Sequence, residues 1–192
     1  MNGFEKQELE TQGMMSRLFG SKPGHNALVE INNFLAESTA ATELTEEIVS
    51  NFIKNWGAKF DSSNIEYRSS MYRKVADHVY ISAVSKDDPV FEETKHLAQV
   101  LELPEKLQRL ADNGAKKVAY FSRCRKIISG EEPLTISEIN NVFGYDYEDG
   151  YDIRVQVFHD YLNKKFDEIA EQQRFSPDEE TALREICTKL DI

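Results

Sequence analysis

Residues 120–144 read YFSRCRKIISGEEPLTISEINNVFG, and this stretch decides the fold class. Its first half places apolar residues at three- and four-residue steps, at Phe121, Cys124 and Ile128. Such steps put side chains on one face of a helix, which can then be buried. After a polar turn, Thr135 stands three residues before Glu138, the pattern of a capping box at the start of a second helix. The stretch therefore predicts two helices joined by a short polar turn.

The same helical spacing recurs along most of the chain. Four further apolar stripes have it: Ile48, Phe52 and Trp56; Val75, Val79 and Ala83; Phe158, Leu162 and Phe166; and Leu183, Ile186 and Leu190. We therefore predict an all-α protein of about eight amphipathic helices. Its predicted core includes the following residues: Trp56, Val79, Leu101, Phe121, Phe143, Phe158, Leu162 and Ile186.

One stretch carries a competing signal. Asp149-Gly150 lies between alternating apolar residues, which is typical of a β-hairpin turn. No second pair of strands is indicated elsewhere in the sequence, and an isolated hairpin is only marginally stable. The helical stripe also continues to about Gln172. We therefore favour a helix that begins near residue 150.

Helix-start residues recur at a nearly regular interval. Four residues that can accept hydrogen bonds from the free N–H groups of a first helical turn are spaced 43, 47 and 41 residues apart: Thr45, Asp88, Thr135 and Ser176. A period of 41–47 residues is that of stacked two-helix repeats. The spacing therefore predicts four such repeats, and an ordinary bundle of eight helices is the alternative.

The composition is that of a globular protein. The chain has 192 residues, of which 40% are apolar and 30% are charged, with nine Gly and five Pro. These values exclude collagen, a Pro/Gly-rich linker and a largely disordered chain. No run approaches the roughly 18 uncharged apolar residues of a membrane span, and the first residues lack the features of a signal peptide. We therefore expect a cytoplasmic protein without stable membrane insertion.

The negative charge is concentrated in one part of the chain. Of the net charge of −11, residues 1–126 carry −1, while residues 127–192 hold 16 acidic and 6 basic side chains and carry −10. This acidic C-terminal third would repel nucleic acid and anionic lipid. It would attract cations or a basic protein partner. The alternative is that acidic helices only keep the domain in solution.

We expect two parts along the chain. Residues 1–24 are predicted to be a flexible or loosely docked N-terminal segment, because they are largely polar and end in a Lys-Pro-Gly break. This segment contains four apolar residues that could form one turn: Met14, Met15, Leu18 and Phe19. Residues 25–192 are predicted to form a single all-helical domain that includes the acidic C-terminal third.

Two stretches carry a resemblance to a known family. Residues 120–144, quoted above, and residues 157–192, which read VFHDYLNKKFDEIAEQQRFSPDEETALREICTKLDI, resemble the tellurite-resistance TerB-like helical domains. The resemblance spans about residues 72–192. It implies a cytoplasmic bacterial helical module in a stress-response or defence assembly, without established catalysis. In that family, acidic residues at the turns are associated with metal binding.

A cluster of carboxylates is the candidate metal site. Hard cations take several oxygen ligands, so the grouping of Asp87, Asp88 and Glu92 is suitable chemistry for a divalent cation. The alternative role of these residues is to stabilise the positive end of a helix dipole. Apart from this cation, we expect no cofactor.

A second acidic cluster, formed by Glu148, Asp149 and Asp152, surrounds a glycine. An EF-hand register would place Tyr145 and Tyr147 where side-chain oxygen ligands are needed, so the segment does not fit that motif. We assign the cluster instead to the binding of a basic protein partner.

The motifs of catalysis are weak. His159-Asp160, with His78 and His96 upstream, has the residue types of a metal-dependent HD phosphohydrolase. Adjacent residues do not share a helix face, which argues against this interpretation. The chain has no GxSxG, GxxxxGK[ST] or GxGxxG motif. Cys124 and Cys187 lie far apart on apolar stripes and are expected to be buried structural residues rather than reactive thiols.

A basic segment surrounds two aromatic residues and contains Lys116, Lys117, Arg123, Arg125 and Lys126. Such a pattern can bind nucleic acid, but cations near the end of a helix also oppose its negative dipole end. We prefer the second interpretation and expect no nucleic-acid partner. The sequence thus predicts a non-enzymatic helical interaction or adaptor module. A divalent-cation-binding TerB-like regulator and an HD-type hydrolase are the alternatives.

Overall fold

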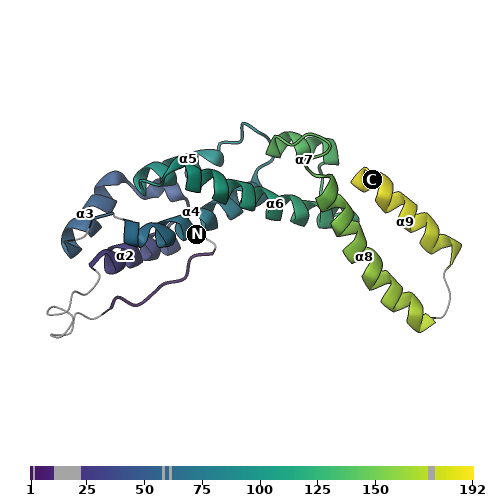
Figure 1. The fold of residues 1–192 in the computed structure, drawn as a ribbon, viewed down its shortest axis with the longest axis horizontal. Helices are drawn as coiled ribbons and strands as arrows, with labels where there is room; N and C mark the ends of the chain where they lie inside the picture. The colour runs from purple at the N-terminus through teal and green to yellow at the C-terminus, as the bar shows by residue number, and fades with distance from the viewer. Residues whose placement is uncertain (2, 11–22, 58, 61, 173–175) are drawn as a thin grey trace. The chain divides into compact units, whose positions relative to one another are not determined.

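The computed structural model describes residues 1, 3–10, 23–57, 59–60, 62–172 and 176–192 (Figure 1). These residues form eight α-helices and two short 3₁₀ helices, and none of them is in a strand. The helices are α2 (Pro23–Glu37), α3 (Glu46–Trp56), α4 (Ile65–Ser82), α5 (Phe91–Val100), α6 (Glu105–Ser129), α7 (Ile136–Phe143), α8 (Tyr151–Gln172) and α9 (Pro177–Leu190), and the 3₁₀ helices are η1 (Ala41–Glu43) and η2 (Ser62–Asn64). The predicted all-α fold is confirmed, and α8 replaces the alternative hairpin.

Three of the four predicted helix starts are confirmed. The Thr45 hydroxyl accepts a hydrogen bond from the backbone N–H three residues on, at 3.3 Å, and α3 begins at the next residue. Thr135 and Glu138 form a reciprocal capping box at the start of α7, and Ser176 and Glu179 form another at the start of α9. These starts were predictable because a cap involves only residues within one turn of one another.

The fourth predicted start, at Asp88, is wrong. Helix α5 begins at Phe91, and its N-cap residue Val90 makes no side-chain cap. A backbone turn precedes the helix instead, in which the Glu92 N–H donates to the carbonyl of Pro89 at 3.0 Å. The Asp88 carboxylate accepts from the N–H of Val84 at 2.9 Å, so it stabilises the preceding turn.

The helices alternate in length along the chain. In each successive pair a longer helix precedes a shorter one: 15 and 11 residues, then 18 and 10, 25 and 8, and 22 and 14. This order is the one expected for four two-helix units. The stacking of these pairs as equivalent repeats stays a prediction.

The chain divides into two compact units where one domain over residues 25–192 was expected. Unit 1 comprises Met1–Val79 and Pro89–Ala115, and unit 2 comprises Tyr80–Asp88 and Lys116–Ile192. Two of the three boundaries fall inside α4 and α6, and the third lies between Asp88 and Pro89, before α5. A sequence signals a boundary through a polar or Pro/Gly-rich linker, so a boundary within a continuous helix has no such signal.

The core of unit 1 gathers apolar side chains from α2, α3, α4 and α5. Its largest fully buried members include Leu28, Ile31, Leu35, Met71 and Leu101. Phe4, from the part of the chain expected to be loosely docked, belongs to the same cluster and is only 7% exposed. The N-terminal segment therefore contributes to this core. The apolar turn expected at residues 14–19 lies outside the described residues.

The core of unit 2 is built around aromatic rings. Tyr120 and Phe143 meet edge to face with their ring centroids 5.8 Å apart, and Tyr80 and Tyr145 pack against the same Phe143 ring at 6.1 and 5.9 Å. Such tilted arrangements are the favoured geometry of aromatic pairs. Helices α8 and α9, which pack together in this unit, bury Val157, Ile186 and Leu190 among other residues (Figure 1).

Half of the predicted core residues are fully buried. Val79, Leu101, Phe143 and Ile186 are in the core. The other four, Trp56, Phe121, Phe158 and Leu162, are only partly buried. Helical periodicity identifies which face of a helix is turned inward, but the width of the covered strip depends on the neighbouring elements.

Candidate functional site

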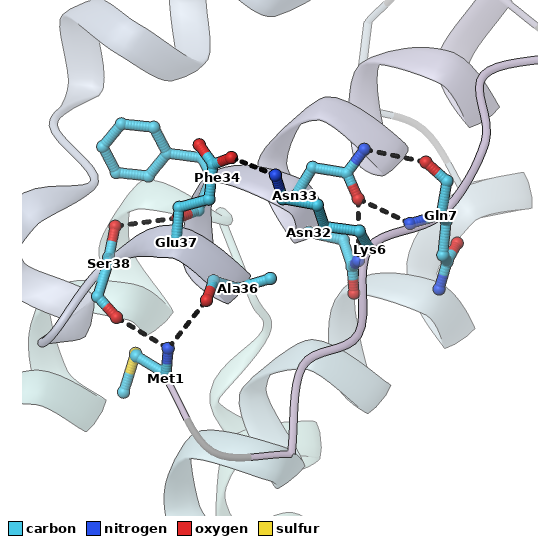
Figure 2. A network of polar contacts seen from close by, with 9 residues as sticks. All are labelled: Met1, Lys6, Gln7, Asn32, Asn33, Phe34, Ala36, Glu37 and Ser38. Atoms are coloured by element: carbon cyan, nitrogen blue, oxygen red, sulfur yellow. Dashed lines mark hydrogen bonds and ion pairs between the residues drawn. The ribbon is translucent and has the colours of Figure 1, made fainter.

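An extended stretch of the N-terminal segment is bound along α2 by asparagine side chains. Asn33 accepts from the Gln7 N–H at 2.8 Å and donates to the Gln7 carbonyl at 2.9 Å (Figure 2). Asn26 repeats this arrangement with Glu10, at 2.9 and 3.0 Å. Each side-chain amide thus makes two hydrogen bonds to the backbone of one residue, as the edge of a neighbouring β-strand would do.

The spacing of the two asparagines matches the spacing of the backbone that they bind. Asn26 and Asn33 are separated by two helical turns, or about 10.5 Å along the axis of α2. Gln7 and Glu10 are three residues apart, which is about 10 Å in an extended chain. The later asparagine binds the earlier residue of the segment, so the segment runs antiparallel to α2.

A third asparagine completes the contact surface. Asn32 is 1% exposed, and its amide donates to the carbonyl of Glu5 at 2.8 Å. The same amide donates to Asn33 Oδ1 at 3.3 Å, which helps to orient the Asn33 side chain. Leaving a buried amide without hydrogen-bonding partners is unfavourable by a few kcal/mol. The extended N-terminal segment supplies such partners and thereby stabilises the buried asparagine side chains. We call Asn26, Asn32 and Asn33 the asparagine row.

Side chains of the segment also contact the body of unit 1. The Phe4 ring lies in the core, and the Lys74 ammonium of α4 is 5.1 Å from its centroid. The Gln7 side-chain carbonyl accepts from the Tyr67 hydroxyl, also of α4, at 2.7 Å. Burial raises the pKa of Tyr67, and the hydrogen bond to Gln7 acts in the opposite direction.

The first residue is bound at the C-terminal end of α2. The Met1 α-ammonium donates to the carbonyls of Ala36 and Ser38 at 3.2 and 2.6 Å (Figure 2), and to that of Leu35 at 2.9 Å. These carbonyls lie where a helix runs out of internal partners and where its dipole is negative. Lys6 adds an ion pair with Glu37. Polar contacts therefore join α2 to the segment at Met1, Glu5, Lys6, Gln7 and Glu10.

Sequence reasoning missed this site because it treated the two interacting stretches separately. The N-terminal stretch is polar and was expected to be loosely docked. The signal that could have revealed the site is in α2, where Asn26 and Asn33 stand seven residues apart on a helix with an apolar core face. Polar amides at such positions require hydrogen-bonding partners.

The predicted cation ligands are not gathered into one cluster in the described structure. Asp87 is exposed, Asp88 accepts from Val84, and the Glu92 carboxylate pairs with Lys95 at 2.6 Å. Within the described part of the chain, no group of three or more His, Cys, Asp or Glu residues could hold a metal ion. The structure therefore does not bring Asp87, Asp88 and Glu92 together for this purpose.

The second acidic cluster forms the turn before α8. The Asp149 carboxylate accepts from the Asp146 N–H at 3.0 Å, and the Asp146 carboxylate accepts in return from the N–H groups of Glu148 and Asp149, both at 2.9 Å. Asp149 is therefore part of the turn itself. The side chains of Glu148 and Asp152 are exposed at the N-terminal end of α8.

A buried arginine supports this turn from inside unit 2. Arg154 is fully buried, and its guanidinium donates to the Tyr120 hydroxyl at 3.0 Å and to the Tyr147 carbonyl at 3.1 Å. Tyr120 in turn donates to Asn140 at 2.8 Å. Burial raises the pKa of Tyr120 to about 12, although the Arg154 contact acts in the opposite direction. The network links α6, α7 and α8 in unit 2.

The candidate catalytic residues have ordinary surroundings. His159 is exposed and contacts Asn163 at 3.2 Å, and Asp160 accepts from Gln156 at 2.7 Å. Cys124 is buried, as expected, and burial raises the pKa of its thiol to about 12. Cys187 is partly buried, and both cysteines are free. These contacts account for the HD pair as two residues of a helix surface.

Two members of the basic segment make contacts inside unit 2. The Lys116 ammonium donates to the carbonyl of Phe143, at the end of α7, at 2.9 Å. The Arg123 side chain is buried, donates to the carbonyl of Ala83 at 2.6 Å and lies 3.8 Å from the carboxylate of Glu132. Lys116 lies in the middle of α6 and therefore meets the negative end of a different helix, α7, whereas the expected interaction of the basic residues with the end of their own helix stays a prediction.

Among the described helices, none combines the length and apolar character needed to cross a membrane. Comparisons of the chain with models of protein families, with curated proteins and with solved structures found no match. The resemblance of residues 72–192 to TerB-like domains therefore stays a prediction, and function must be argued from the geometry alone.

Proposed function

We propose that the protein is a non-enzymatic interaction or adaptor module that binds an extended segment of a partner protein along α2. The observation that carries this proposal is the paired contact of Asn26 and Asn33 with the backbone N–H and C=O of Gln7 and Glu10. Backbone contacts of this kind supply affinity for many sequences, while side-chain contacts select among them. An asparagine row that binds one extended segment has the chemistry to bind another.

The chain's own segment would act as a tethered competitor. A short flexible tether gives an effective concentration in the millimolar range, so a free peptide competes at a disadvantage. Partner binding would therefore require a higher affinity than that of residues 3–10, or release of those residues. We infer an adaptor whose site is occupied until a suitable partner segment is present.

The test uses the full chain with its own segment weakened. Gln7→Pro removes one N–H that the asparagine row binds, so the whole segment, including Phe4, is held less firmly and can be displaced by a peptide. An acetylated, fluorescently labelled peptide with the sequence of residues 3–10 should bind this variant at least about tenfold more tightly than the wild type, which corresponds to about 1.4 kcal/mol. Fluorescence anisotropy measures this difference.

The control variants separate the asparagine row from general effects. Adding Asn33→Ala to Gln7→Pro should reduce peptide binding at least about tenfold, because two hydrogen bonds are lost. Adding Asn51→Ala, which changes an exposed asparagine of α3, should leave binding unchanged. Absence of saturable binding to a folded Gln7→Pro variant would contradict the proposal.

We also propose that Glu148, on the turn before α8, and Asp152, in the first turn of α8, bind a basic partner. The exposure of both carboxylates, next to a turn held by Arg154, supports this second surface. The double change Glu148→Gln and Asp152→Asn should weaken salt-sensitive binding of an oligolysine peptide and, because it places no cation at the positive end of α8, lower the melting temperature only slightly. Asp149 is kept because its carboxylate accepts a hydrogen bond within the turn. Equal binding by the double variant would contradict this assignment.

A further inference from the structure

We infer that the site formed by the asparagine row and the neighbouring Lys74, Tyr67 and His25 selects partner segments in which an aromatic residue is followed, at three-residue steps, by a glutamine and an acidic residue. The inference rests on the proposed function and names the class of ligand that the site takes. The pattern is aromatic-x-x-Gln-x-x-Glu, and the chain's own example is Phe4, Gln7 and Glu10. Each of the three positions has its own contact in unit 1.

The aromatic position has the most demanding surroundings. Phe4 is 7% exposed and packs in a cluster with residues of α2 and α4 that include Leu28, Ile31 and Met71. The Lys74 ammonium faces its ring at 5.1 Å, a cation–π distance. A small side chain at this position would leave a cavity and lose the contact with Lys74. The first position of a partner segment should therefore be aromatic.

The middle position is bound through both its backbone and its side chain. Asn33 pairs with the backbone of Gln7, while the Tyr67 hydroxyl donates to the Gln7 side-chain oxygen. If the side chain at position 7 had no oxygen within reach of Tyr67, the partly buried Tyr67 hydroxyl would lose this hydrogen-bond acceptor. The last position meets a weaker requirement, since the Glu10 carboxylate is 3.8 Å from the His25 ring and gains attraction when the imidazole is protonated.

The contacts also define the backbone conformation of the ligand. In a β-strand, residues two apart face the same side, so residues three apart face opposite sides. Here the backbone groups of Gln7 and Glu10, three apart, both face α2. The Glu5 carbonyl, two residues before Gln7, is bound by α2 as well, so the segment is extended but follows neither a two-residue nor a three-residue period throughout. Among residues 3–10 only Phe4 is buried, and the exposed Gln7 and Glu10 are distinguished by their hydrogen bonds to α2.

This geometry makes proline a discriminating probe. Proline at position 8 should be accepted, because the N–H of Glu8 is not among the groups that the asparagine row binds and proline favours an extended conformation at the preceding residue. Proline at position 7 or 10 removes an N–H that Asn33 or Asn26 binds. A site that merely favoured apolar peptides would not distinguish these positions.

The experiment measures acetylated peptides of residues 3–10 against the full-length Gln7→Pro protein. Relative to the parent peptide, Phe4→Ala should bind at least about tenfold more weakly, and Gln7→Ala about three- to tenfold more weakly. Glu8→Pro should bind equally well or more tightly, whereas Gln7→Pro and Glu10→Pro should lose most binding. Leu9→Ala is the matched control and should bind like the parent.

A second measurement covers the case in which the variant protein does not fold. With wild-type protein, an excess of unlabelled parent peptide should accelerate hydrogen exchange at the Gln7 amide of the chain's own segment. The Phe4→Ala peptide at the same concentration should accelerate it less. Equal binding by all peptides would overturn the selected pattern and leave the proposed function standing. Binding by none of them, in either measurement, would overturn both.

Discussion

Single residues decide how closely the helices of unit 2 approach one another. Gly150, immediately before α8, lies against Tyr120, and a Cβ added there would come within 2.5 Å of the Tyr120 Cζ atom. The Arg154 guanidinium then reaches the hydroxyl of the same tyrosine. Because Gly150 has no Cβ, Tyr120 can lie close to the start of α8, where its hydroxyl accepts a hydrogen bond from the buried Arg154 guanidinium.

The first prediction concerns this close approach. Gly150→Ala should destabilise the protein by about 1–3 kcal/mol, because the added methyl group overpacks a filled site and displaces Tyr120. Gly24→Ala is the control, since its added Cβ would meet only a side-chain nitrogen of Asn64 at 3.3 Å. Urea denaturation of the three proteins measures the difference. Equal midpoints for Gly150→Ala and the wild type would contradict the packing argument.

At the scale of elements, the helix starts are stabilised by local hydrogen bonds. In α7 the Glu138 carboxylate accepts from the N–H of Thr135 at 2.8 Å, while the Thr135 hydroxyl accepts from the N–H of Glu138 at 3.4 Å. The hydrogen bonds from the Thr135 N–H and hydroxyl hold the pKa of Glu138 below its ordinary value. The capping box therefore links the stability of α7 to pH.

The second prediction follows from this capping box. Thr135→Ala should reduce the free energy of unfolding by about 1 kcal/mol at neutral pH. Because the pKa of Glu138 is lower in the folded state, its contribution is present above the ordinary pKa of a glutamate and is lost as the pH falls through the lowered value. The stability difference between wild type and Glu138→Gln should therefore shrink on acidification. A difference that stayed constant from neutral pH to about pH 3 would contradict this linkage.

At the scale of the whole molecule, stretches far apart in sequence complete one another in unit 1. The polar residues 3–10 supply partners for the asparagine row, and Phe4 fills part of the core. In return, α2 and α4 hold an extended stretch that has no internal hydrogen-bonding pattern of its own. Order in this segment is therefore a consequence of tertiary contacts.

The third prediction tests these contacts residue by residue. Asn33→Ala should accelerate hydrogen exchange at the Gln7 amide, and Asn26→Ala should accelerate it mainly at Glu10, because each change removes one acceptor. Amide exchange followed by NMR resolves the two sites. Asn51→Ala, on the exposed surface of α3, should alter neither. Identical exchange at both amides in all variants would show that the asparagine row does not hold the segment.

The sequence by itself determined the all-α fold class, most helix positions and the starts at Thr45, Thr135 and Ser176, because these depend on periodicity and on contacts within one turn. Local signals failed at α5, where a backbone turn replaces the expected Asp88 cap. Only the tertiary structure decided that residues 3–10 lie on the asparagine row, that Arg154 is buried, and that the chain divides into two compact units. Each of these features pairs residues distant in the chain. A polar stretch therefore has the same local sequence signature whether it is free in solvent or hydrogen-bonded to a helix.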